Sequence, residues 1–563
     1  MKPALLAALI LLALAPPAAA QELTSPARYD VPPPGWKQTP AAVMRAVAAR
    51  SDVRAARRGH AGTYGRVYYK SKAKRRWQVS FFAPPESGHG RSKELSQTVV
   101  DDRSGRVLES WTGYKVDWTM ARGYAGAFGR IANALWIWLP FCVLFVLPYA
   151  RPPLRLLHLD LAVLLAFSVS YAFFNASRID VSAPLVYPLL VYLLARMLGI
   201  AVFRSRGREP PPPRLTVPVG VLGIATVFLL GVRCGLNVIG SNVIDVGYAS
   251  VVGADHFAAG DPVYGHFPAE VSHGDTYGPV LYYAYVPFET LLPWRGTWDD
   301  LPAAHAAAVT FDLLTAAGLW LLGRRLRGPD LGALLAYAWV SFPFTLLVAN
   351  SGANDGLVAL LVTAAMLALA RPAVRGAVIA AAALTKFAPV VLAPLFATYR
   401  DGEAARAPRV IAVTAGAFAA AAALALAPVA FGDGLGTFYD RTLGFQADRG
   451  SPFSVWGLYG GLDVLQAVVT VAALVLAVVV AFVPRRRDPV AVAALGAAVL
   501  IALQLALDHW FYLYLVWFLP LVLVALLSGR RIVSIDSARE GVEEPAAVLT
   551  TTAISHGSSS EES

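Results

Sequence analysis

Residues 217–237 read VPVGVLGIATVFLLGVRCGLN, and residues 238–287 continue VIGSNVIDVGYASVVGADHFAAGDPVYGHFPAEVSHGDTYGPVLYYAYVP. The first stretch is apolar and has the roughly 20 residues that a helix needs to cross a bilayer. The second stretch places a carboxylate, Asp245, soon after the end of the first, among glycine, proline, tyrosine and histidine residues. An ionisable side chain is costly beside a bilayer, so Asp245 marks a candidate functional site.

The composition places the whole chain among membrane proteins. Of its 563 residues, 56% are hydrophobic and 15% are charged, whereas roughly a quarter of the residues in a soluble domain are charged. Repeated apolar runs predict a mostly α-helical, polytopic transmembrane bundle of about 11 spans. We expect these spans near residues 131–150, 154–174, 183–203, 217–237, 303–323, 331–349, 353–370, 409–431, 462–483, 488–507 and 510–528.

The distribution of charge predicts the topology. The net charge is +11, and the arginines gather in short loops between apolar runs, as cytoplasmic loops do. We therefore expect no nucleic-acid partner, and we place residues 239–301, 350–355 and 431–461 outside, together with the N-terminal region. The two cysteines, Cys142 and Cys234, lie in apolar runs without spaced partners, so neither a disulfide framework nor a metal site is predicted.

One apolar segment, residues 374–397, breaks the alternation of loop charges. Arginines flank it on both sides, and its middle reads Lys386-Phe-Ala-Pro389, which interrupts a continuous helix. We interpret it as a re-entrant hairpin, with a plain span and one misplaced loop as the alternative. Lys386 is the only lysine after Lys115, and a buried ammonium implies a partner, either a phosphate or a carboxylate such as Asp355. The alternative for Lys386 is that it reaches toward the inner surface.

The chain divides into five predicted parts. Residues 1–20 have the charged start, apolar centre and small-residue end of a signal peptide, with an uncleaved anchor as the alternative. Residues 21–125 form a small extracytoplasmic α+β domain, and residues 131–203 add transmembrane helices. Residues 216–528 form the transmembrane core. Residues 532–563 are acidic, rich in serine and without apolar periodicity, which is typical of a disordered cytoplasmic tail.

Within the exported domain, one helix is expected over residues 39–58. Its candidate buried positions are Ala42, Val43, Val47 and Val53. Strands are expected over residues 65–70, 76–82, 97–101 and 107–113, with a turn at 102–105. This order of elements, with WQVSFF and VVDDRSGRVLESWTG, resembles a PepSY-like domain.

The outer loops hold the residues that are suited to catalysis. Partial desolvation raises the pKa of a carboxylate and makes it a better general base, which is the role predicted for Asp245. The alternative is a helix cap or a loop carboxylate paired with an arginine. Substrate-binding candidates share its loop, and two arginines of the 431–461 loop suit phosphate, although ordinary structural roles remain open for the histidines and arginines. These candidates are Tyr248, His266, His273, Asp275, Tyr277, Lys386, Arg441 and Arg449.

Several short motifs carry a family resemblance. The acidic residue in the first large outer loop, followed by Gly260-Asp-Pro-Val-Tyr-Gly265 and Tyr277-Gly-Pro279, resembles the GT-C superfamily. The closest pattern is that of the actinobacterial polyprenyl-phosphate-mannose-dependent mannosyltransferases, family GT87, also called DUF2029. The resemblance covers roughly residues 216–527 and includes Lys386-x-x-Pro389 and RGSPFSVWG at 449–457. It assigns the family's acidic catalytic residue to Asp245, after an N-terminal addition that the family pattern lacks.

The resemblance implies an inverting glycosyltransferase of the inner membrane that works on its outer face. It implies transfer of a sugar, most simply mannose, from a polyprenyl-phosphate donor to a glycolipid or envelope glycan, with membrane lipids around the site. One carboxylate suffices as base because the phosphate leaves as an anion, so no cofactor or metal is expected. Two other classes stay open: a lipid or solute transporter, which would contain inverted repeats, and a membrane sensor with an exported ligand-binding domain.

Overall fold

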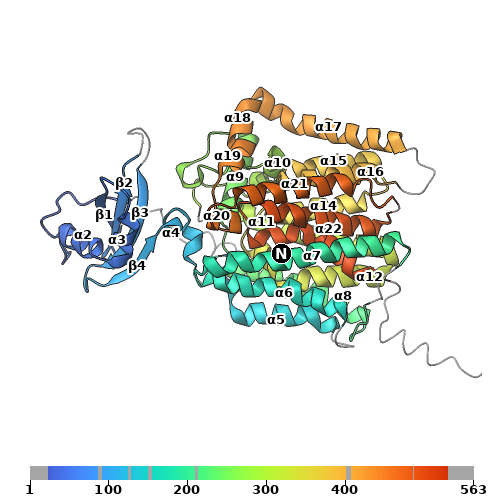
Figure 1. Ribbon diagram of the computed structural model, residues 1–563, viewed down its shortest axis with the longest axis horizontal. Coiled ribbons are helices and arrows are strands. Elements are labelled where there is room, and N and C mark those ends of the chain that lie inside the picture. The colour runs from blue at the N-terminus through green and yellow to red at the C-terminus, as the bar shows by residue number, and fades with distance from the viewer. Residues whose placement is uncertain are drawn as a thin grey trace, which may run out of the picture.

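The computed structural model shows a small domain beyond one end of a helical bundle (Figure 1). The predicted signal peptide and the predicted tail lie outside the described residues. The structure describes residues 23–85, 92–123, 128–149, 155–208, 213–298, 300–400, 407–485 and 487–529.

The small domain packs two short helices against one antiparallel sheet. Helix α2 spans Pro40–Ala48 and α3 spans Ser51–Arg57. The sheet has the strand order β1-β2-β3-β4, with bounds Tyr64–Ser71, Arg76–Ala83, Lys93–Asp101 and Val107–Thr112. Alternate residues of β2 face the helices, and the shared core contains Val43, Val47, Val53, Trp77 and Val79.

The single helix expected over residues 39–58 is wrong in one respect, since the helix is interrupted after Ala48. Arg50 has extended backbone angles, φ −67° and ψ 145°, and it precedes α3. Thr39 caps α2 by accepting a hydrogen bond from the Ala42 amide. The interruption turns α3 so that Val53 joins the same core as Val47.

Among the described residues, six helices are long and apolar enough to cross a membrane, by length and composition. They are α6 Leu156–Asn175, α7 Ile179–Ser205, α8 Val219–Gly240, α11 Pro302–Arg327, α17 Ala407–Phe431 and α22 Pro489–Ala506. The pair α12 Pro329–Ser341 and α13 Pro343–Asn350, bent by 60°, makes a seventh if it is one span.

The expected number of about 11 spans is not confirmed. The other four expected spans coincide with shorter apolar helices. A helix of 13 residues, for example, extends only about 20 Å at 1.5 Å per residue, whereas the hydrocarbon core of a bilayer is about 30 Å thick. They are α5 Leu135–Val146, which continues as a 3-10 turn to Tyr149, α14 Asp355–Leu367, α21 Asp463–Val479 and α23 Leu515–Leu527.

The segment that contains Lys386 doubles back on itself. Helix α15, Pro372–Ala383, is followed by the 3-10 turn η5, Ala388–Leu392, and by α16, Ala393–Thr398. Arg375 near the start of the segment donates from Nη2 to the carbonyl of Tyr399 just after its end, over 2.8 Å. The two ends therefore meet, as the predicted hairpin requires, and Lys386 lies at the turn between them.

The end of the bundle nearest the small domain gathers the remaining short elements (Figure 1). They are α4 Tyr114–Asp117, α9 Asp245–Ala259, α10 Pro279–Leu291, α18 Leu435–Tyr439, α19 Phe445–Asp448 and α20 Val455–Leu458. The predicted outer loops thus share one end of the molecule with the small domain. This end carries the candidate site.

Candidate active site beside helix α9

Asp245 is the first residue of α9, and the preceding segment is fastened to the turn between α13 and α14. The Asn242 amide donates to the Asn350 carbonyl over 3.1 Å, and the Ile244 amide donates to the Ser351 carbonyl over 3.0 Å. Two residues after Asp245, a Cβ added to Gly247 would lie 2.2 Å from the Gly352 carbonyl oxygen. Only glycine permits this close approach, so the start of α9 is held firmly.

The carboxylate of Asp245 is exposed to water, yet burial by the surrounding protein raises its pKa above the ordinary value. A hydrogen bond of 2.9 Å from the Val246 amide to Oδ1 lowers the pKa, as do the charges of Arg449 and Lys386, whereas Asp355 raises it. Among the described side chains no arginine pairs directly with Asp245, and the carboxylate is suited to accepting a proton.

Lys386 lies in a cage of aromatic rings and one carboxylate. Its ammonium is 2.7 Å from Oδ1 of Asp355 and between 5.3 and 5.6 Å from the ring centres of Tyr277, Tyr514 and Trp517. The predicted carboxylate partner is therefore confirmed. Lys386 is only 7% exposed, so it does not extend toward the inner surface.

Arg449 follows α19 and stacks on aromatic rings. Its guanidinium lies 5.0 Å from the ring centre of Trp118 and 5.8 Å from that of Phe445. Within the described part of the chain, no carboxylate forms an ion pair with Arg449. Its charge therefore remains available to an anionic ligand.

His509 joins the same group of residues. Its Nδ1 lies 2.9 Å from Oγ of Ser451, and its ring centre lies 5.6 Å from that of Trp118. Burial holds the pKa of His509 well below its ordinary value, and the charges of Arg449 and Lys386 lower it further. We therefore expect a neutral imidazole at neutral pH.

Arg441 is engaged in holding the outer loops together. Its Nε donates to Oδ2 of Asp275 over 2.6 Å, and its Nη2 donates to Oδ1 over 3.0 Å and to the Ser272 carbonyl over 2.6 Å. Asp275 is fully buried and also accepts from the Gly265 amide. Two of the predicted binding residues thus bind each other and fasten the 431–461 loop to the Asp245 loop.

The other three candidates occupy different surroundings. Tyr248 is buried in an apolar cluster, where its ring stacks on Trp298 at 4.9 Å. His266 is exposed. His273 stacks on Phe445 at 4.6 Å, which places it beside Arg449. Burial lowers the pKa of His273, and the charge of Arg441 lowers it further.

Sequence reasoning missed the aromatic walls of the site. Trp118 belongs to the segment that connects the small domain to the bundle, and no motif links it to Arg449. Tyr514 and Trp517 lie within the expected span 510–528, where their apolar surroundings are typical of a membrane helix. No group of three or more metal-ligating side chains occurs in the part of the chain that the structure describes.

Comparison with known families gives one match. The model of Glycosyltransferase family 87 matches residues 276–506, which makes this part of the chain similar to that family. The matched segment contains Tyr277, Lys386, Arg441 and Arg449, and it begins after Asp245. No match confirms the resemblance of the small domain to PepSY domains, and none of the curated proteins matches the chain.

Proposed function

We propose that this GT87-like membrane glycosyltransferase is an inverting enzyme of the GT-C type that uses a polyprenyl-phosphate sugar. The sugar is most simply mannose, and the acceptor is a glycolipid or envelope glycan at the outer face of the inner membrane. The observation that carries the proposal is the exposed carboxylate of Asp245, which has no arginine partner among the described side chains. Nearby protein raises its pKa, and the positive charges of Arg449 and Lys386 act on it.

In the proposed reaction Asp245 is the general base. An acceptor hydroxyl attacks the anomeric carbon while its proton passes to the Asp245 carboxylate. The bond from the anomeric carbon to the phosphate oxygen breaks, and the lipid phosphate leaves with the electron pair. The configuration inverts in this single displacement. No second carboxylic acid is needed because the leaving phosphate is already a stable anion.

Arg449 is the proposed partner of that phosphate. A guanidinium binds phosphate oxygens through a fork of donors, and Arg449 has no carboxylate partner among the described side chains. Lys386 contributes a fixed positive charge that Asp355 partly balances. Preorganised charge of this kind stabilises a leaving anion without reorganisation during the reaction.

The surroundings of the site suit a lipid-linked donor. The apolar helix α17 leads to the 431–461 loop, and only 6% of its most apolar window is buried within the protein. Such an apolar surface faces lipid in a membrane protein. A polyprenyl chain can therefore stay in the bilayer while its phosphate and sugar reach the charged loops.

The test measures how fast the Asp245→Asn variant transfers radiolabelled mannose from polyprenyl-phosphate mannose to membrane acceptors. We expect a loss of at least about a hundredfold, the lower end of a general base's contribution. Asp261→Asn, an exposed aspartate of the same loop, is the matched control and keeps transfer. An Asp245→Asn enzyme with the native rate would exclude Asp245 as base. Replacing the donor with polyprenyl-phosphate glucose tests the sugar.

A further inference from the structure

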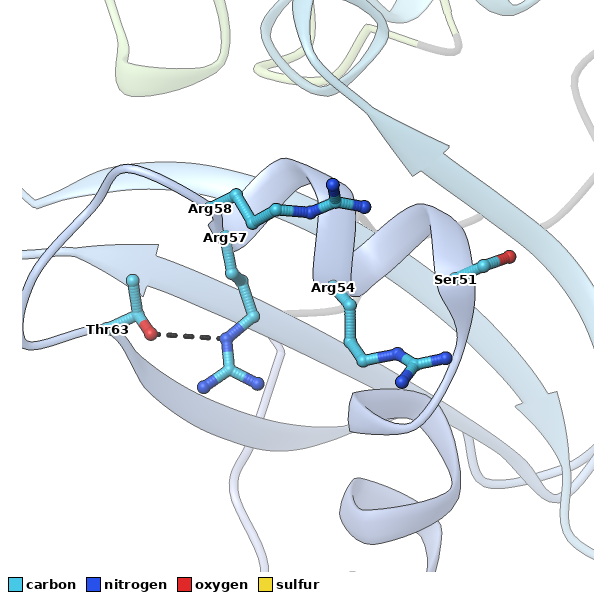
Figure 2. A pocket seen from close by; sticks show the side chains of 5 residues that line it. All are labelled: Ser51, Arg54, Arg57, Arg58 and Thr63. Carbon is cyan, nitrogen blue, oxygen red and sulfur yellow. Dashed lines mark hydrogen bonds between the residues drawn. The ribbon is translucent and has the colours of Figure 1, made fainter.

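The small domain contains a positively charged hollow that the reaction at Asp245 does not use. Figure 2 shows its lining residues Ser51, Arg54, Arg57, Arg58 and Thr63. The hollow has a volume of about 560 Å³. Three of its five lining residues carry a positive charge, and none carries a negative charge.

The three arginines come from one short stretch of the chain at the end of α3. Arg54 and Arg57 are three residues apart in α3, a spacing that makes helix side chains neighbours. Arg58 follows as the C-cap residue, with extended backbone angles of φ −63° and ψ 133°. Arg57 is held in place, because its Nε donates to Oγ1 of Thr63 over 3.1 Å (Figure 2) and its guanidinium lies 4.4 Å from the ring centre of Phe81. One cation of the hollow is thus preorganised by the sheet beneath it.

Neighbouring acidic groups do not neutralise the hollow. The nearest carboxylate in sequence, Asp52, pairs with Arg50 at 2.9 Å and accepts from Ser110 at 2.7 Å. Arg54 and Arg58 are exposed, and in the described part of the chain neither forms an ion pair with a carboxylate. Like charges that line one hollow repel one another, and an anion bound among them offsets that repulsion.

The position of the hollow argues against a lipid headgroup as the ligand. Helix α3 belongs to the small domain, which stands beyond the ends of the bundle helices, and α4 joins the two parts (Figure 1). A membrane around the bundle would leave α3 in the aqueous space. The planar fork of arginine donors matches a pair of oxygens on a phosphate or a carboxylate.

We propose that this hollow binds an oxyanion, phosphate or carboxylate, on a water-exposed envelope glycan, and that the glycan is the acceptor. The role as acceptor rests on the proposed function, whereas binding of the oxyanion does not. The small domain then holds an anionic polymer above the membrane while its hydroxyl-bearing end reaches Asp245. The substrate class is an anionic glycan rather than a neutral one.

The binding test uses the full chain in nanodiscs of neutral lipid and fluorescein-labelled phosphorylated dextran at 0.15 M salt. The double variant Arg54→Gln/Arg58→Gln should bind about tenfold more weakly or worse, since it removes two cations that can form charge-assisted hydrogen bonds to the oxyanion. The control Arg45→Gln/Arg103→Gln removes two exposed arginines of the same domain. It should bind within about twofold of the native chain, as surface changes elsewhere do.

Three outcomes overturn the proposal. They are the absence of polymer binding by the native chain, equal losses in the two double variants, and displacement of the polymer by phosphatidylglycerol vesicles but not by inorganic phosphate. The first would show that the hollow does not bind the phosphorylated polymer. The second would leave only general surface charge as the cause of binding. The third would assign the hollow to lipid headgroups.

A second measurement separates this inference from the reaction. Asp245→Asn should lose transfer and keep polymer binding. Arg54→Gln/Arg58→Gln should raise KM for the phosphorylated acceptor and leave both kcat and transfer to a neutral acceptor unchanged. An unchanged KM for the phosphorylated acceptor would refute the acceptor role even if transfer itself is intact.

Discussion

The ammonium of Lys386 lies 2.7 Å from Oδ1 of Asp355, and the indole of Trp517 donates to the same oxygen over 2.8 Å. This relationship joins the turn of the hairpin to the start of α14. The other carboxylate oxygen of Asp355 is buried without a hydrogen-bond partner among the described residues. The Lys386–Asp355 pair therefore fixes the positive charge of Lys386 near Asp245, while Oδ2 of Asp355 stays buried without a hydrogen bond from the described residues.

Lys386→Met should destabilise the protein, because it leaves the carboxylate of Asp355 buried and unpaired. Breaking a buried pair on one side costs about 3–5 kcal/mol. The double variant Lys386→Met/Asp355→Asn should recover most of that stability but not the transfer rate. Thermal unfolding in detergent and the mannose-transfer assay measure the two effects separately. If the double variant also regains transfer, Lys386 has only a structural role.

The pH dependence of transfer should report Asp245. A base acts in its ionised form, so kcat/KM should fall as the pH is lowered through the raised pKa of Asp245. Arg449 lowers that pKa, so Arg449→Gln should move the acidic limb to higher pH. The measurement is kcat/KM against pH for the native enzyme and Arg449→Gln. A limb that stays in place in the variant would show that another group titrates.

The same shift has a consequence for stability. Because the folded-state pKa of Asp245 lies above its unfolded value, the folded state retains the proton more strongly. This contribution to stability is fully present below the unfolded pKa and is lost as pH rises through the folded pKa. Asp245→Asn should therefore unfold at the same or a higher temperature than the native protein at pH 7. A clear loss of stability would mean that the ionised carboxylate is held by favourable contacts.

Trp118→Ala should weaken donor binding through Arg449. A cation–π contact contributes about 0.5–2 kcal/mol, which corresponds to roughly a twofold to thirtyfold rise in the donor KM. Trp118→Phe should restore much of the affinity, and Trp136→Ala, at a side chain that is 66% exposed, should leave the donor KM unchanged. Steady-state kinetics with varied donor test this. A fall in kcat with an unchanged KM would argue against positioning of Arg449 by Trp118.

Arg441→Gln should affect stability more than Asp275→Asn. Loss of the Arg441 guanidinium leaves the fully buried carboxylate of Asp275 without a cation, a change that costs about 3 kcal/mol or more. The neutral asparagine leaves a partly exposed arginine that water can solvate. Limited proteolysis of the outer loops and thermal unfolding compare the two variants. If Arg441→Gln is stable but inactive, Arg441 contacts the substrate directly.

Several features follow from the sequence because they depend on local chemistry. The length of apolar runs and the placement of arginines indicate a membrane bundle with its polar loops at one end. The four strands agree with alternation and turn residues to within a few positions. A single lysine in an apolar segment required a partner, and Asp355 could be named because it is one of few carboxylates in that part of the chain.

Only the tertiary structure decided which charges are engaged and which are free. Arg441 and Arg449 are eight positions apart in one loop, and as a sequence they are equivalent candidates for phosphate. Arg441 meets Asp275, a residue 166 positions away, whereas Arg449 meets the ring of Trp118 from the connecting segment. Ion pairs form between groups that the packing of distant helices brings within about 4 Å, and no local pattern in the chain encodes that approach.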